Sequence, residues 1–212
     1  MDQRPQSLGE EIANSVSHGA GFLAAAIAVP FLLVATVERG AAINVVGAAI
    51  FGAAMLLLYF ASALYHALPP GRAKRVFVKI DHGAIYLFIA ASYTPFALGA
   101  LHGGWGWTLF GIVWALALAG IMLKTFDRLA RPVLSTGLYL VMGWLALIAI
   151  VPLSARVPTA GLALLFGGGI AYTAGVIFFA ADSRWRYAHS VWHLFVLIGS
   201  ACHFVAVLDY AA

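Results

Sequence analysis

Seven long apolar runs, separated by short polar loops, dominate the sequence. A helix that crosses a bilayer needs about 20 mostly apolar residues, because the hydrocarbon core is about 30 Å thick and each helical residue rises about 1.5 Å. The apolar runs cover residues 17–37, 43–66, 80–101, 105–123, 133–153, 159–181 and 187–209. The pattern predicts an all-α, polytopic membrane protein that folds as a single bundle of seven transmembrane helices.

The composition supports a membrane protein and excludes several other classes. Hydrophobic residues make up 63% of the chain and charged residues only 9%, whereas about a quarter of the residues in soluble domains are charged. Cys202 is the single cysteine, so an internal disulfide is excluded. The net charge of +4 comes from loop residues and forms no basic patch suited to nucleic acid. We therefore expect no nucleic-acid partner.

The loop charges predict the orientation of the bundle. Ten of the 12 Lys and Arg residues lie in the N-terminal segment and in the loops after the second, fourth and sixth runs. The other loops contain only Arg39 and Arg156. Because positively charged loops are retained in the cytoplasm, we predict a cytoplasmic N-terminus and an external C-terminus.

Two histidines four residues apart, His189 and His193, stand at the start of the last run. Residues at this spacing lie on one face of a helix, so both rings can bind one metal ion. The predicted orientation brings His66, which ends the second run, and Asp81, which opens the third, to the same cytoplasmic level. Ionisable residues inside membrane helices are costly and therefore indicate function. We predict that His66, His189 and His193 bind a metal ion.

Two further residues complete the candidate site. Ser62 lies one helical turn before His66 on the same face, where its hydroxyl can orient a ligand or a bound water. Asp81 is expected to contact the metal, either directly or through a bound water. Three histidines with one open position are typical of catalytic zinc, which lowers the pKa of its water to about 7. Zn²⁺ is the predicted cofactor, although imidazole ligands also suit copper, iron and nickel.

The remaining histidines are interpreted as structural. His203 lies about 21 Å along the helix from His189, too far to bind the same ion, and is expected to bond another helix. His82 points about 100° away from its neighbour Asp81. For His18, a cap or loop contact is favoured over a supporting role at the metal. His102 is expected to be an exposed loop residue.

Several motifs together resemble the bacterial hemolysin III family, which is related to the progestin and adipoQ receptors and, more distantly, to the alkaline ceramidases. These motifs are Glu11, Asn14 and Ser17-His18-Gly19, then SALYH (62–66), IDHGAIYLFIAASYTPF (80–96) and HSVWHLFVLIGSACHF (189–204). The resemblance implies a seven-helix protein of the bacterial plasma (inner) membrane. It also implies a zinc site at the cytoplasmic end, with His66, His189 and His193 as ligands, Asp81 on the zinc-bound water and Ser62 beside it.

The favoured function is zinc-dependent hydrolysis of an amide or ester bond in a membrane lipid. In this hypothesis Asp81 moves a proton and Ser62 positions an oxygen. The alternative is a non-enzymatic membrane-homeostasis or receptor-like protein in which a structural zinc, closed by a fourth ligand, joins the helices. Cytolysis, which the family name implies, is disfavoured because no amphipathic pore-forming segment is evident. Zinc transport is disfavoured because the outer half of the bundle offers few polar groups. No oligomeric state is predicted.

Overall fold

The computed structural model describes residues 4–128 and 132–211, and these residues form helices without a strand. Seven helical spans are long and apolar enough to cross a membrane, which confirms the predicted fold class. The elements are α1 (Leu8–Glu38), α2 (Ala42–Ala67), α3 (Arg72–Phe96) with the π-helical turn η1 (Ala97–Leu101), α4 (Gly103–Thr125), α5 (Pro132–Gly143), the 3₁₀ turn η2 (Leu145–Ala149), α6 (Ile150–Ser154), α7 (Thr159–Ala180) and α8 (Ala188–Tyr210). The fifth span is composite, because α5, η2 and α6 together make one crossing, Val133–Ser154.

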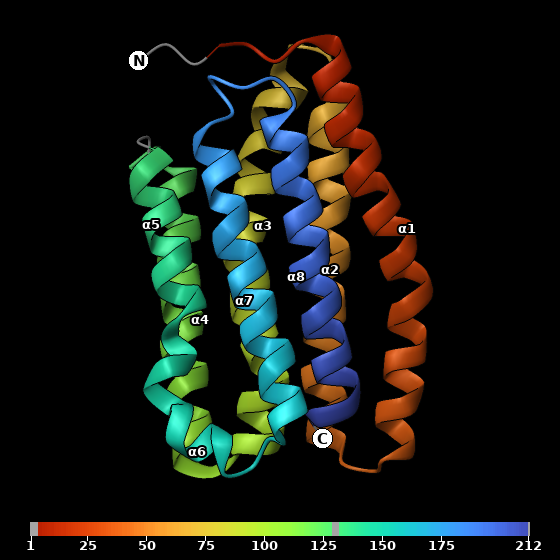
Figure 1. The fold of residues 1–212 in the computed structure, drawn as a ribbon, viewed down its shortest axis with the longest axis vertical. Helices are drawn as coiled ribbons and strands as arrows, with labels where there is room; N and C mark the ends of the chain where they lie inside the picture. The colour runs from red at the N-terminus through yellow and green to blue at the C-terminus, as the bar shows by residue number, and fades with distance from the viewer. Residues whose placement is uncertain (1–3, 129–131, 212) are drawn as a thin grey trace.

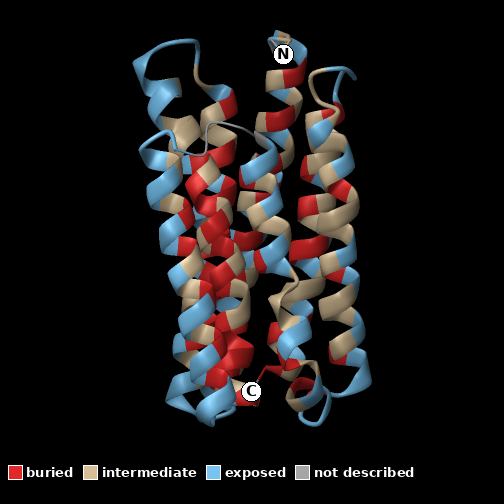
Figure 2. Ribbon diagram, turned by 90° about the vertical axis from the view of Figure 1, so that its left-hand side faces the viewer, coloured by how far each residue is buried: buried red, intermediate tan, exposed pale blue. Residues whose placement is uncertain are grey.

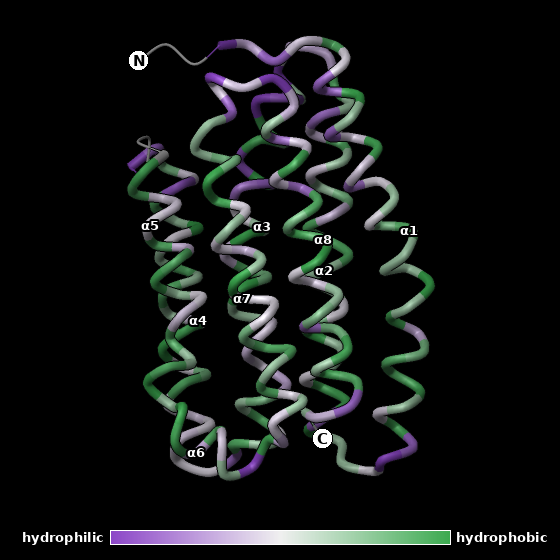
Figure 3. Tube along the Cα trace, viewed as in Figure 1, coloured by the Kyte–Doolittle hydropathy of each residue, from purple (hydrophilic) through white to green (hydrophobic). Residues whose placement is uncertain are grey.

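The two termini lie at opposite ends of the bundle, as an odd number of crossings requires (Figure 1). We call the end that carries the N-terminus the N-terminal end. α1 packs on α2 and α8, α2 packs on α3, α3 packs on α4, and α7 packs on α8. Most of the hydrophilic stretches lie at the N-terminal end (Figure 3), so most of the polar residues are found at this end of the bundle.

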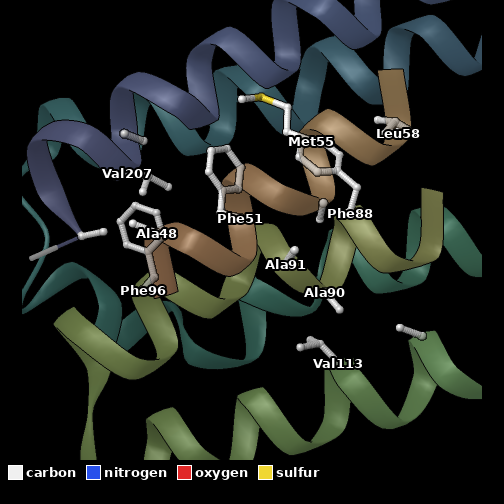
Figure 4. Packing of buried hydrophobic residues seen from close by; sticks show 14 of the residues in the cluster. Ala48, Phe51, Met55, Leu58, Phe88, Ala90, Ala91, Phe96, Val113 and Val207 are labelled. Carbon is white, nitrogen blue, oxygen red and sulfur yellow. The ribbon is translucent and has the colours of Figure 1, made fainter. Parts of the chain in front are cut away.

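The core lies along α2 and α3, whose inward faces are buried while the outer faces of the bundle are exposed (Figure 2). Phe51 and Met55 of α2, Phe88 of α3 and Val207 of α8 belong to one buried cluster (Figure 4). Small residues such as Ala90 of α3 lie in the same cluster. Lipid tails are as apolar as leucine, so membrane helices associate through close packing, which small residues permit.

Two helices begin earlier than the apolar runs predict. α1 begins at Leu8, well before residue 17, and α3 begins at Arg72, before residue 80. The reason at α1 is a capping box: the Ser7 hydroxyl accepts from the Glu10 backbone N–H, and the Glu10 carboxylate accepts from the Ser7 backbone N–H at 2.9 Å. Hydropathy detects only the apolar part of a helix, whereas α1 and α3 each begin with polar turns that precede the apolar part.

Gly120 of α4 lies where a side chain would collide with Tyr86 of α3. A Cβ atom at Gly120 would be 2.5 Å from Tyr86 Cε1, and the Tyr86 ring is fully buried. We expect Gly120→Ala to lower the free energy of unfolding by about 1–3 kcal/mol through overpacking. Gly111→Ala in the same helix is the matched control, because a Cβ there would meet no atom within 4 Å. The control should be neutral or stabilising by up to about 1 kcal/mol. Thermal unfolding in one detergent compares the two, and equal midpoints would contradict this packing.

Candidate metal centre

Three histidines converge at the N-terminal end of the bundle. His66 lies in the last turn of α2, and His189 and His193 lie in the first turns of α8. One ring nitrogen from each of the three lies within 4.8 Å of the other two. Two nitrogens bound tetrahedrally to one zinc ion at about 2.0–2.1 Å lie roughly 3.4 Å apart, so a small inward movement of the rings would bring them to metal-binding positions.

An oxygen acceptor faces the Nδ1 atom of each ring. The acceptors are Glu11 Oε2 for His66 at 2.8 Å, Asp182 Oδ2 for His189 at 3.2 Å and the Asn14 carbonyl oxygen for His193 at 3.2 Å. Carboxylate and carbonyl oxygens accept hydrogen bonds, so these contacts favour the tautomer in which Nδ1 carries the proton and Nε2 keeps its lone pair. Histidines that bind metals usually donate their other ring nitrogen in this way.

The Nε2 atom of His66 supports this assignment independently. It is buried and has no hydrogen-bond partner among the residues that the structure describes. Leaving a buried polar atom unpaired costs about 1–3 kcal/mol, and a metal ion at the centre of the three rings would satisfy it. The donor set, three neutral imidazoles with their outer nitrogens fixed, therefore fits a metal ion such as zinc.

Helix α1 supports two of the three rings, those of His66 and His193, and the sequence patterns did not predict this contribution. Its residues at spacings of three and four share one helix face. Asn14 Oδ1 accepts a hydrogen bond from Ser190 Oγ at 2.6 Å, and Ser17 Oγ lies 3.0 Å from His193 Nδ1. With Glu11, these residues contact candidate metal-binding histidines of both α2 and α8. The signal in the sequence was a polar stripe with helical spacing that precedes and enters the first apolar run.

His18 lies inside the bundle, and among the described residues its side chain contacts Ser62, Tyr59 and His193 of other helices, so the favoured expectation of a cap or loop contact was wrong. Its side chain is 3% exposed, and its Nδ1 lies 2.7 Å from Ser62 Oγ. The His18 and His193 rings stack, with centroids 3.5 Å apart and planes at 9°. The physical reason is the early start of α1, which carries His18 about three turns into the helix. His18 thereby contacts both His193 and Ser62.

Ser62 and Asp81 line the same cavity as His189 and His193. Both are buried, with Ser62 1% and Asp81 7% exposed. Beyond this polar end the cavity continues between apolar side chains toward the C-terminal end, where it reaches Leu101. The arrangement places a carboxylate and a hydroxyl beside the three histidines, at the polar end of a largely apolar chamber.

The other three histidines are not part of the group formed by His66, His189 and His193. His203 Nε2 donates to the Leu165 carbonyl oxygen of α7 at 3.2 Å, which confirms the predicted bond to another helix. His102 is exposed between η1 and α4, as predicted. His82, for which a structural role is predicted, also lines the cavity.

Comparison with known proteins places the chain in a family. The family model described as "Haemolysin-III related" matches residues 6–204, a range that includes all the candidate site residues. The chain is 47% identical over 207 residues to the "Hemolysin-3 homolog" of Bacillus subtilis (strain 168), covering 96% of this chain and 95% of that protein. It is 42% identical over 210 residues to "Hemolysin-3" of Bacillus cereus, covering 99% and 95%.

A more distant relative extends the comparison to animals. The human "Monocyte to macrophage differentiation factor" is 30% identical over 170 residues, which cover 76% of this chain and 68% of that protein. These matches agree with the family resemblance of the sequence and with the seven-helix fold. The chain is a multi-pass membrane protein that belongs to the haemolysin III family.

Proposed function

We propose that this protein is a zinc-dependent hydrolase that cleaves an amide or ester bond of a membrane lipid. One observation carries the proposal: two members of the histidine cluster, His189 and His193, line one end of a largely apolar cavity together with Asp81 and Ser62. Structural zinc sites are usually closed by four protein ligands. Among the described residues, the metal-binding group contains three histidines, which leaves a position for a substrate oxygen or water.

Each residue has a distinct task in this proposal. His66, His189 and His193 hold the ion, which when bound supplies Lewis acidity and lowers the pKa of water to about 7. Asp81 accepts a proton from the water that attacks the carbonyl carbon and returns it to the departing amine or alcohol. Ser62, oriented by His18, hydrogen-bonds an oxygen of the substrate or of the attacking water.

The cavity indicates the substrate class. Its lining away from the histidines is mainly apolar and aromatic, including Ile85, Phe88 and Leu109. Such a chamber favours an acyl chain, while the few polar groups at one end orient the bond to be cleaved. The buried surroundings also keep bulk water away from Asp81. A lipid whose acyl chain is joined through an amide or ester bond fits both the apolar chamber and its polar end.

Asp81→Asn tests the proposal because it keeps the size of the side chain and removes the proton acceptor. Hydrolysis of ceramides, lysolipids and phospholipids is followed by mass spectrometry with metal-loaded and chelated protein. General acid–base groups contribute about 10²–10⁴-fold, so turnover should fall by at least about 100-fold while bound metal is retained. Asp127→Asn, at an exposed residue of the same end, is the matched control. Absence of metal-dependent hydrolysis, or equal turnover by Asp81→Asn, refutes the proposal.

A structural metal is the second candidate function. The three ligands come from α2 and α8, and α8 packs mainly on α7 and α1. A metal ion would therefore link α2 to α8 at this end, where the His66 ring lies 5.1 Å from the His189 ring and 5.2 Å from the His193 ring. This candidate gains support if chelation lowers the unfolding temperature and no lipid in the panel is hydrolysed.

A further inference from the structure

A groove runs along the outside of the bundle between α2, α3 and α4 at the N-terminal end. One face of α3 forms its floor, with Arg72, Arg75, Lys79, Gly83 and Leu87 at helical spacing. Leu57 of α2 and Ile121 of α4 line its sides. The groove is separate from the histidine cavity, which Asp81 lines from a different face of α3.

The polarity of the groove changes along its length. Arg72 and Arg75 lie in the first turn of α3, and Leu87 lies roughly 20 Å further along the helix. Both arginines are exposed, and neither forms an ion pair with any residue in the described ranges. Lys79 pairs with the exposed Asp127 at 2.8 Å. The upper end of the groove is therefore a positive site without a counter-charge.

The lower part of the groove is apolar and open. Leu57 of α2 is 41% exposed and faces the surroundings of the bundle. Gly83 contributes to the opening, because a Cβ atom there would contact only Ile121, at 4.0 Å. A Cβ atom at Gly83 would meet no backbone atom of another helix within 4 Å.

We infer that this groove binds an anionic phospholipid, with its phosphate at Arg72 and Arg75 and an acyl chain along Leu57, Leu87 and Ile121. Guanidinium groups bind phosphate oxygens in a bidentate manner, and basic pockets between transmembrane helices bind anionic head groups. The lipid supplies the counter-charge that the two arginines lack and covers the exposed apolar floor. The inference is independent of the metal and of the proposed hydrolysis.

Native mass spectrometry of the detergent-purified full chain tests the charge component. The protein is titrated with phosphatidylglycerol and with phosphatidylcholine of the same acyl chains. We expect Arg72→Gln/Arg75→Gln to weaken phosphatidylglycerol binding by roughly 30-fold, from the contribution of two basic residues near a membrane surface. Phosphatidylcholine binding should change little. Arg184→Gln/Arg186→Gln removes the same charge from exposed residues of the α7–α8 loop at the same end and should preserve phosphatidylglycerol binding.

Gly83→Leu tests the acyl-chain component, because it fills the groove and keeps every charge. It should weaken phosphatidylglycerol binding by at least about fivefold, which corresponds to the loss of one or two buried methylene groups. In a separate competition experiment, inorganic phosphate should not displace the lipid. The inference is overturned if wild-type protein binds both lipids equally, if the two arginine pairs weaken binding equally, or if phosphate alone competes as well as the lipid. Unfolding temperatures without added lipid verify that each variant is folded.

Discussion

Replacement of both His189 and His193 by alanine is expected to abolish metal binding. Purified wild-type protein should contain about one zinc ion per chain, as a site with three histidine ligands requires. The double variant removes two of the three ligands and leaves only His66. Elemental analysis of detergent-purified protein measures the difference. His203→Ala is the matched control, because it removes a histidine from the same helix about 21 Å away, and it should retain the metal.

The same pair of proteins tests whether the metal stabilises the fold. A ligand that binds only the native state stabilises it by about 4 kcal/mol when its concentration is a thousand times its Kd. Chelation should therefore lower the unfolding temperature of the wild type and leave that of His189→Ala/His193→Ala unchanged. A wild type prepared without chelators that contains no metal would contradict the site, and the hydrolase proposal would fall with it. Metal retained by the double variant would show that other residues bind it.

The fold and the ligand cluster follow from short-range patterns that a sequence displays directly. Apolar run lengths predict the seven spans, and the spacing of His189 and His193 predicts a shared helix face. Counting loop charges then brings His66 to the same end as this pair. The structure places one ring nitrogen of each within 4.8 Å of the others. Periodicity and helix direction were sufficient because each ligand lies near the end of a membrane helix.

The supporting residues escaped prediction because their roles depend on where α1 begins. Hydropathy assigns the turns before residue 17 to a polar leader, since Glu10, Glu11 and Asn14 interrupt the apolar pattern. The capping box at Ser7 instead starts a regular helix at Leu8. Once these turns are helical, Glu11, Asn14 and His18 fall on one face and meet α2 and α8.

The cavity and the groove depend on packing between helices, which a single sequence does not encode in its periodicity. The close approach of α3 and α4 requires a glycine opposite Tyr86, and Gly120 is one of many glycines in the chain. Gly83 is equally hard to recognise in the sequence, although its role is the opposite one of leaving space beside Ile121. Residue type alone does not distinguish a glycine that permits contact from one that leaves a groove open.

Glu11 is the residue of α1 from which we expect the largest effect on the metal. Its Oε2 accepts from His66 Nδ1 at 2.8 Å, and its Oε1 accepts from Lys74 Nζ at 2.8 Å. One carboxylate thus connects α1 with α2 and α3 while holding the His66 ring with Nε2 free. Glutamine at this position keeps the length of the side chain but offers one acceptor oxygen in place of two and carries no charge. Either His66 or Lys74 must then lose its partner.

Glu11→Gln should weaken metal binding by about 10- to 100-fold, the range found when groups that orient metal ligands are removed. Competition with a chromophoric chelator measures the Kd for zinc directly, without reference to any enzymatic activity. Glu38→Gln is the control, because Glu38 is exposed at the other end of the same helix and its replacement should leave the Kd unchanged. Unfolding temperatures without metal separate lost positioning from lost folding. If a folded Glu11→Gln variant binds zinc as tightly as wild type, His66 is oriented by its packing alone, and Glu11 has only a structural role.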